Sequence, residues 1–227
     1  MPTNMDALCA ALSRSPQPYF FCQHVQDVDL IGWEPLASII CNAYTNIMGN
    51  YVPGDELFIF GFSRGAIAAR ALANLVARIG VLLVEGLDTG QHWQEAMTAM
   101  LNGKLDTFKV KKINPNEDYG VAEDLTPRAY NVDIEVVGCW DTVANLSSKY
   151  KHLDTRLVKG EMNFLFLLAG SDGVFAGIKH AFHALALDEC RGSFTPRLWH
   201  MPDDPEVAKC MYTCRAYYSA DTALNSH

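Results

Sequence analysis

Apolar residues recur along the chain with two spacings, one typical of helices and one typical of buried strands. Between Glu34 and Met48 they fall on one helical face, at Leu36, Ile40, Ala43 and Ile47. Pro35 suits the first turn of this helix, where an N–H group would have no partner within the helix. After a Pro-Gly-Asp turn, the apolar run Leu57–Phe60 predicts a fully buried strand.

The same alternation continues along the chain. Arg64–Ile79 predicts an alanine-rich helix that is apolar on two faces and packs closely against a sheet. Ile134–Trp140 is β-branched and apolar, and it predicts a second buried strand, whereas Gly173–Leu187 predicts a helix. Helices that alternate with buried apolar strands indicate an α/β fold with a parallel sheet.

Three further segments give weaker signals. Tyr19–Val25 predicts a short buried strand, and Gln91–Leu101 predicts a helix with Trp93 on its apolar side. Residues 102–128 are polar and contain two prolines, which indicates a surface excursion or a lid.

Composition narrows the class of protein. The chain has 227 residues, of which 49% are hydrophobic and 19% charged, enough to form one domain with a sizeable core. With 18 Lys and Arg against 26 Asp and Glu, the net charge of −8 argues against a nucleic acid partner. We find no signal peptide and no apolar run long enough to span a membrane, so we expect a cytoplasmic protein.

The cysteines and histidines suggest no metal site. Seven cysteines at irregular spacing indicate reduced thiols rather than a disulfide framework. Cys210 and Cys214 lie close to His200 and His227, but their spacing is not that of a structural zinc site. We therefore expect neither a metal nor another cofactor.

Chemistry enters with Gly61-Phe62-Ser63-Arg64-Gly65, a G-x-S-x-G sequence. Three such common residues match by chance in about one chain of this length in ten, so the pattern alone is weak. Its position between a buried strand and a helix is the one a nucleophile elbow requires. There the two glycines permit a tight turn, the Ser63 hydroxyl can meet a base, and the Arg64 N–H can bind an oxyanion. The alternative is an ordinary turn with Ser63 as the helix N-cap.

An acid and a base should follow the serine in the chain. Asp141 comes directly after the strand Ile134–Trp140, at the sheet edge where α/β sites lie, and could orient a histidine. A simple turn or cap explains Asp141 equally well. His180 and His183 fall in the predicted helix Gly173–Leu187, where a core or surface role is the plainer interpretation.

Three ordered motifs resemble one family. Gly-Phe-Ser-Arg-Gly-Ala at 61–66, Gly-Cys-Trp-Asp-Thr-Val at 138–143 and His-Ala-Leu-Ala-Leu-Asp-Glu at 183–189 look like the α/β-hydrolase-like domain of type VI secretion phospholipase effectors and their fungal relatives. The resemblance covers residues 3–199 and leaves 200–227 as a divergent tail of a single domain, 1–227. It implies a mostly parallel sheet with helices on both faces, Ser63 as nucleophile and Asp141 as acid.

Two parts of the family pattern are missing from this sequence. Such domains usually open with a strand ending in Asp-Gly-Thr, and they continue past the tryptophan into Gly-x-His-x-Asp-Val-Gly-Gly, which the resemblance implies supplies the histidine base. We therefore expect a domain incomplete at both ends, with either His183 or no residue of this chain as the base.

Two functions follow as expectations. The first is a serine hydrolase of the esterase or phospholipase type, which would form an acyl-enzyme on Ser63 from a lipid or other ester substrate. The second is a catalytically impaired or truncated hydrolase fold that serves as a binding scaffold. The sequence identifies no protein partner.

Overall fold

The computed structural model describes residues 34–83, 95, 108–114, 126–142, 177–186, 198 and 211–216, with the backbone alone for 34–37 and 211–216. Their elements are helices α2 (Glu34–Asn50) and α3 (Arg64–Ile79) and seven strands. The strands are β1 (Leu57–Phe62), β2 (Val81–Leu82), β3 (Lys111–Ile113), β4 (Arg128–Tyr130), β5 (Ile134–Trp140), β6 (Ile178–Ala186) and β7 (Met211–Ala216).

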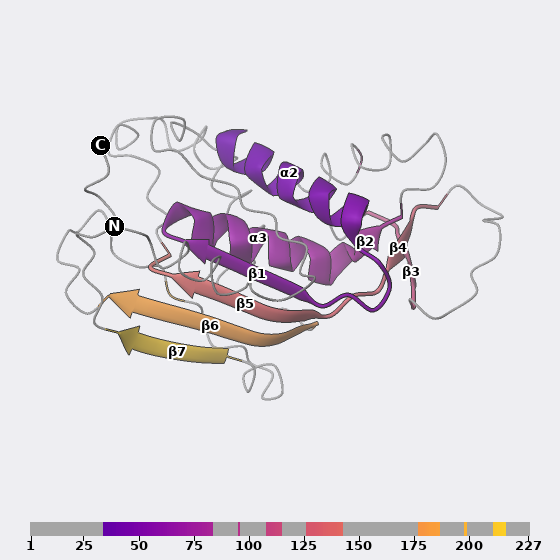
Figure 1. Ribbon diagram of the computed structural model, residues 1–227. Coiled ribbons are helices and arrows are strands. Elements are labelled where there is room, and N and C mark those ends of the chain that lie inside the picture. The colour runs from indigo at the N-terminus through magenta and orange to yellow at the C-terminus, as the bar shows by residue number, and fades with distance from the viewer. Residues whose placement is uncertain are drawn as a thin grey trace.

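The main sheet is parallel throughout the described strands. Its order is β1-β5-β6-β7, so its strands lie side by side in the order in which they occur in the chain, with β2, β3 and β4 of the second sheet intervening between β1 and β5 (Figure 1). Gly61 pairs with Cys139, Cys139 with His183, and His183 with Thr213. Because all four strands run the same way, their carboxyl ends meet at one edge of the sheet.

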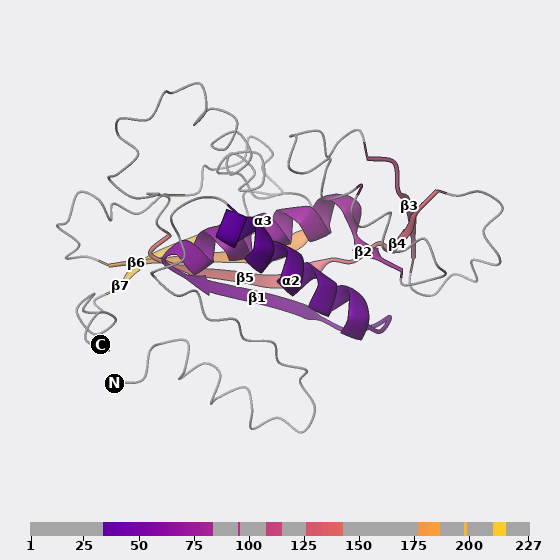
Figure 2. The same cartoon turned by 90° about the horizontal axis from the view of Figure 1, so that it is seen from above.

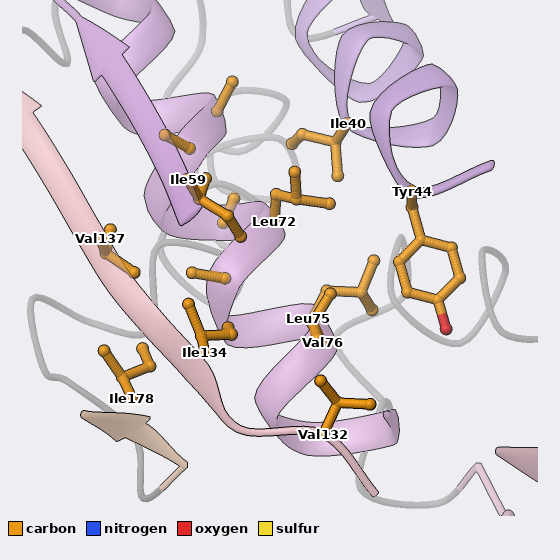
Figure 3. Close-up of a cluster of buried hydrophobic side chains, with 14 of the residues drawn as sticks. Ile40, Tyr44, Ile59, Leu72, Leu75, Val76, Val132, Ile134, Val137 and Ile178 are labelled. Carbon is orange, nitrogen blue, oxygen red and sulfur yellow. The ribbon is translucent and has the colours of Figure 1, made fainter. Parts of the chain in front are cut away.

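The two helices that the structure describes both lie on one side of this sheet. α3 packs directly on β1 and β5, and α2 packs on α3 (Figures 1 and 2). Figure 3 shows the apolar core between them, to which α2 contributes Ile40, α3 contributes Leu72 and Leu75, and the strands contribute Ile59 and Val137. The alanine-rich sequence of α3 allows this close approach, because small side chains bring the helix backbone near the sheet.

A smaller sheet lies beside the end of α3. Its strands are ordered β2-β4-β3, with β2 antiparallel to β4 and β3 parallel to it. Tyr44 of α2 ties this sheet to the helices, because its buried hydroxyl donates to the carbonyl oxygen of Gly80 at 2.8 Å and accepts from the N–H of Leu82 at 3.1 Å. Within the segment 102–128, Lys111–Ile113 forms β3 and Arg128 begins β4, while residues 102–107 and 115–125 lie outside the described residues, so the surface excursion or lid stays a prediction.

The helix predicted over Gly173–Leu187 is wrong for the residues described, because Ile178–Ala186 forms strand β6. Alanine and leucine favour helices, but here pairing with β5 on one side and β7 on the other overrides that propensity. Buried Ala181, His183 and Leu185 alternate with more accessible neighbours, which is the period of a strand. His180 and His183 consequently lie on opposite faces of the sheet.

The other predicted elements divide into two groups. The helices over 34–48 and 64–79 and the strands over 57–60 and 134–140 are confirmed, as is the parallel α/β class. The strand Tyr19–Val25 and nearly all of the helix Gln91–Leu101 lie outside the described residues. Helices on both faces of the sheet stay a prediction. The segment expected as a divergent tail contributes β7 to the sheet.

Candidate active site

Ser63 occupies a strained turn between β1 and α3. Its backbone has φ 54° and ψ −120°, a combination that residues other than glycine rarely adopt. The hydroxyl makes no capping hydrogen bond to the helix, so the N-cap alternative for Ser63 finds no support. The Ser63 side chain therefore plays no part in capping the N-terminus of α3.

The turn is tight because the strand and helix backbones almost touch. A Cβ built on Gly61 would collide with the carbonyl oxygen of Gly65 and lie 2.6 Å from the Cα of Ala66. No side chain fits in that space, which explains the glycine at position 61 on steric grounds. The carbonyl of Gly65 forms the opposing wall of the turn.

The first turn of α3 brings a favourable environment for negative charge. The N–H groups at the start of a helix have no partner in the preceding turn, and the helix dipole places partial positive charge there. Arg64 is the first residue of α3. Its guanidinium is half-buried, and burial lowers its pKa from the ordinary value. The backbone N–H of Arg64 is thus at the place where an oxyanion could be bound.

Asp141 lies beside the serine at the same edge of the sheet. Phe62 and Trp140 pair across β1 and β5, and the Ser63 N–H donates to the Trp140 carbonyl oxygen at 2.8 Å. Ser63 and Asp141 are therefore the residues that follow a directly paired position on adjacent strands. Each has a positive φ, 54° and 42° respectively, so both strands turn sharply where they end.

The end of β6 holds Asp141 in place. The Asp141 N–H donates to the carbonyl oxygen of Ala184 at 3.0 Å, and its Oδ1 accepts from the N–H of Ala186 at 2.7 Å. The side chain thus bonds to a neighbouring strand rather than capping its own turn. Asp141 is 9% exposed, which places the carboxylate at the boundary between the core and the solvent.

His183 lies behind this edge, within the core. It is 1% exposed, and its Nε2 is 3.1 Å from the Oγ1 of Thr142, which is fully buried. Burial and, to a smaller extent, the nearby positive charge of Arg70 together lower the pKa of His183 to about 4. The imidazole is therefore neutral at physiological pH.

Arg70 of α3 is a further buried polar residue near His183. It is 1% exposed, and its charge also acts on the Cys139 thiol, whose pKa burial raises to about 12. Arg70, Cys139, Thr142 and His183 thus form a buried polar cluster between α3 and the strands β5 and β6.

The structure brings some of the predicted site residues together and sets others apart. Gly61, Ser63, Arg64, Gly65 and Asp141 meet at one edge of the sheet. His183 lies two register positions inside that edge, since it pairs with Cys139 and through it with Gly61. Of the seven histidines in the sequence, the other described one is His180, which is exposed on the opposite face.

Sequence reasoning missed Thr142 and Arg70. Thr142 directly follows Asp141, and Arg70 lies among alanines in the middle of α3, where a charged side chain is seldom buried without a partner. Neither signal reveals that His183 is the neighbour of both residues, because the position of His183 depends on the pairing of β5 with β6. Within the described part of the chain, no group of three or more His, Cys, Asp or Glu residues could hold a metal ion.

Comparison with known proteins connects this site to a family. Residues 21–216 match the family described as "T6SS, Phospholipase effector Tle1-like, catalytic domain". The uncharacterized protein YEL023C of Saccharomyces cerevisiae is 30% identical over 180 residues, which are 76% of this chain and 23% of that protein. The chain thus spans less than a quarter of the length of this relative.

Two further findings complete the comparison. No solved structure matches the chain. No helix among the described residues has both the length and the apolar character needed to cross a membrane. The family match covers Ser63, Asp141 and all the described strands, and it extends past Trp199 to include β7, so the chain belongs to the Tle1-like phospholipase effector family.

Proposed function

We propose that this protein is a serine hydrolase that cleaves lipid esters through an acyl-enzyme on Ser63. The observation that carries the proposal is the strained backbone of Ser63 at a glycine-flanked turn between a buried strand and a helix. Strain of this kind persists only where surrounding structure enforces it, and it is concentrated at functional sites. The family description, phospholipase effector, supports a lipid ester as the substrate.

The proposed reaction begins with attack of the Ser63 Oγ on the ester carbonyl carbon. A base takes the serine proton as the bond forms, and the negative oxygen of the tetrahedral intermediate accepts from the Arg64 N–H. Collapse expels the alcohol, which receives the proton from the protonated base. Water then attacks the acyl-enzyme by the same steps, releasing the carboxylic acid and regenerating Ser63.

Asp141 would orient the base. Its Oδ1 accepts from the Ala186 N–H, which fixes the carboxylate and leaves Oδ2 to accept an imidazole N–H. We assign His183 no part in proton transfer, because its Nε2 engages Thr142 inside the core and its pKa of about 4 makes it a weak base. The proposal therefore requires a base other than the two described histidines, His180 and His183.

Labelling with a fluorophosphonate probe tests the proposal, because the probe reacts with activated serines. We expect the purified chain to be labelled and Ser63→Ala to remain unlabelled. Ser38→Ala, which changes an exposed serine on α2, is the matched control and should be labelled like the natural chain. Asp141→Asn should slow labelling by about 100-fold or more, since it would no longer orient the base correctly.

Fatty acid release from phosphatidylcholine vesicles then tests the substrate class. We expect release by the natural chain and none by Ser63→Ala. If circular dichroism shows a folded protein that the probe does not label, the hydrolase proposal fails. The binding-scaffold function then becomes the better account of the fold.

A further inference from the structure

The end of β6 contacts the Asp141–Thr142 turn at three points. Ala184 accepts the Asp141 N–H, Ala186 donates to the Asp141 Oδ1, and the His183 ring bonds to the Thr142 Oγ1. Two of these contacts are made by the β6 backbone, and the third is made by a side chain. The three contacts, which we call the β6 clamp, surround a residue held at a φ of 42°.

The His183–Thr142 contact is the deepest part of the β6 clamp. Both side chains are almost or entirely buried, at 1% and 0% exposure, so no solvent competes for the hydrogen bond. A buried hydrogen bond of this kind costs a full desolvation penalty when one partner is removed. Thr142 is therefore fixed more firmly than an exposed turn residue, and Asp141 is fixed with it.

Arg70 supports the neutral state that this contact uses. Its guanidinium, which α3 contributes to the buried polar cluster, disfavours a second positive charge on His183. A neutral imidazole can donate or accept at Nε2 according to its tautomer, so it can match the threonine hydroxyl in either direction. The helix that carries Ser63 at its start thus also contributes to the environment of the β6 clamp.

We propose that His183 is a positioning residue, which holds Thr142 and thereby directs the Asp141 carboxylate toward the base. The inference rests on the proposed function, in which Asp141 is the acid of a serine hydrolase. It gives the histidine of β6 a purpose other than that of a general base. It also explains why a polar side chain occupies a strand position that faces the core.

Amide hydrogen exchange tests the β6 clamp without reference to catalysis. In His183→Leu we expect exchange of the Asp141 and Ala186 amides to accelerate by about tenfold or more. The Ile134 amide, which donates to Gly177 at the opposite end of the same strands, should keep its rate. His183→Gln, which retains a hydrogen-bonding group, should restore most of the protection.

The labelling rate tests the catalytic purpose of the β6 clamp. At saturating fluorophosphonate, His183→Leu should lower the maximal labelling rate of Ser63 by about 10- to 100-fold, because a small misplacement of a catalytic group costs this much. The probe concentration for half-maximal rate should not change. His180→Leu, on the exposed face of the same strand, is the matched control and should behave like the natural chain.

A second variant keeps the test decisive if His183→Leu does not fold. Thr142→Val removes the hydroxyl with little change in shape, and it should reproduce the exchange and labelling effects, whereas Thr142→Ser should not. Unchanged exchange at Asp141 and Ala186, or an equal rise at Ile134, would overturn the proposal. If the natural chain is not labelled, the hydrolase function fails, and the exchange rates still decide whether the β6 clamp exists.

Discussion

The backbone N–H of Ser63 donates to the carbonyl oxygen of Trp140 at 2.8 Å, one residue beyond the last paired position of β1 and β5. This bond continues the ladder of the sheet into the turn that holds the serine. It fixes Ser63 beside Asp141, which follows Trp140 directly. The relative position of the two proposed catalytic residues therefore depends on the sheet rather than on a loop.

The close approach at Gly61 predicts a large steric effect. Gly61→Ala would place a Cβ against Gly65 and Ala66, so we expect α3 to be displaced and the free energy of unfolding to fall by about 2 kcal/mol or more. Gly49→Ala is the control, because nothing lies within 4 Å of a Cβ at that helical position. It should be neutral or stabilising by up to ~1 kcal/mol. Equal denaturation midpoints for both variants would contradict the steric argument.

The strained backbone of Ser63 should lower the free energy of unfolding of the protein. Ser63→Gly removes the Cβ from a backbone with φ 54°, so it should raise the free energy of unfolding by about 1 kcal/mol relative to Ser63→Ala. Both variants lack the hydroxyl and should not react with the probe. Urea denaturation of the two provides the comparison, and a less stable glycine variant would show that the turn carries no strain.

The hydrogen bonds of Tyr44 should stabilise the attachment of the β2-β4-β3 sheet to α2. Tyr44→Phe removes a buried hydroxyl that bonds to the Gly80 carbonyl and the Leu82 N–H, leaving both without this partner. We expect a loss of about 1–3 kcal/mol in the free energy of unfolding. Ile40→Val, which shortens a neighbouring core residue of α2, gives the scale for simple loss of packing, at about 1 kcal/mol. A Tyr44→Phe loss well below that of Ile40→Val would rule out an important role for the hydroxyl.

The neutral state of His183 predicts a dependence of stability on pH. Its pKa is about 4 in the folded protein against an ordinary value of 6.5, so between these values the unfolded chain binds a proton that the folded protein does not. The stability from this group is fully present above pH 6.5. It is lost as the pH falls toward 4, at up to about 1.4 kcal/mol per pH unit, and the loss stops below 4.

Other groups titrate in the same range, so the measurement is a difference. The free energy of unfolding of the natural chain, minus that of His183→Gln, should decrease between pH 6.5 and 4 by about 3 kcal/mol. A difference that stays constant over this interval would show that His183 titrates alike in the folded and unfolded chain.

The sequence predicts the central elements well because their signals are strong. α3 and β5 begin and end where the pattern places them, since a long apolar periodicity and a β-branched run each favour one structure. β6 is misread because alanine and histidine provide little contrast between inward and outward positions. The strands β2, β3 and β4 have two or three residues each and become strands through pairing, which no local pattern reveals.

The candidate site likewise has a part that the sequence predicts and a part that it does not. Ser63 and the glycines beside it are adjacent in the chain, so a local motif can identify them. The contact of Thr142 with His183 depends on the register in which β5 pairs with β6, and the approach of Arg70 to His183 depends on how α3 packs on the sheet. These relationships arise only when the chain is folded.

The strand order of the main sheet also bears on how the protein assembles. Ile59 pairs with Val137, Val137 with Ala181, and Ala181 with Met211, so each described strand of the main sheet pairs with the strand of this sheet that precedes it in the chain. During synthesis, β1 and α3 emerge before β5, and β5 emerges before β6 and β7. Since these pairings are distant in sequence, the chain must close long loops before they form, so folding should be slow in vitro.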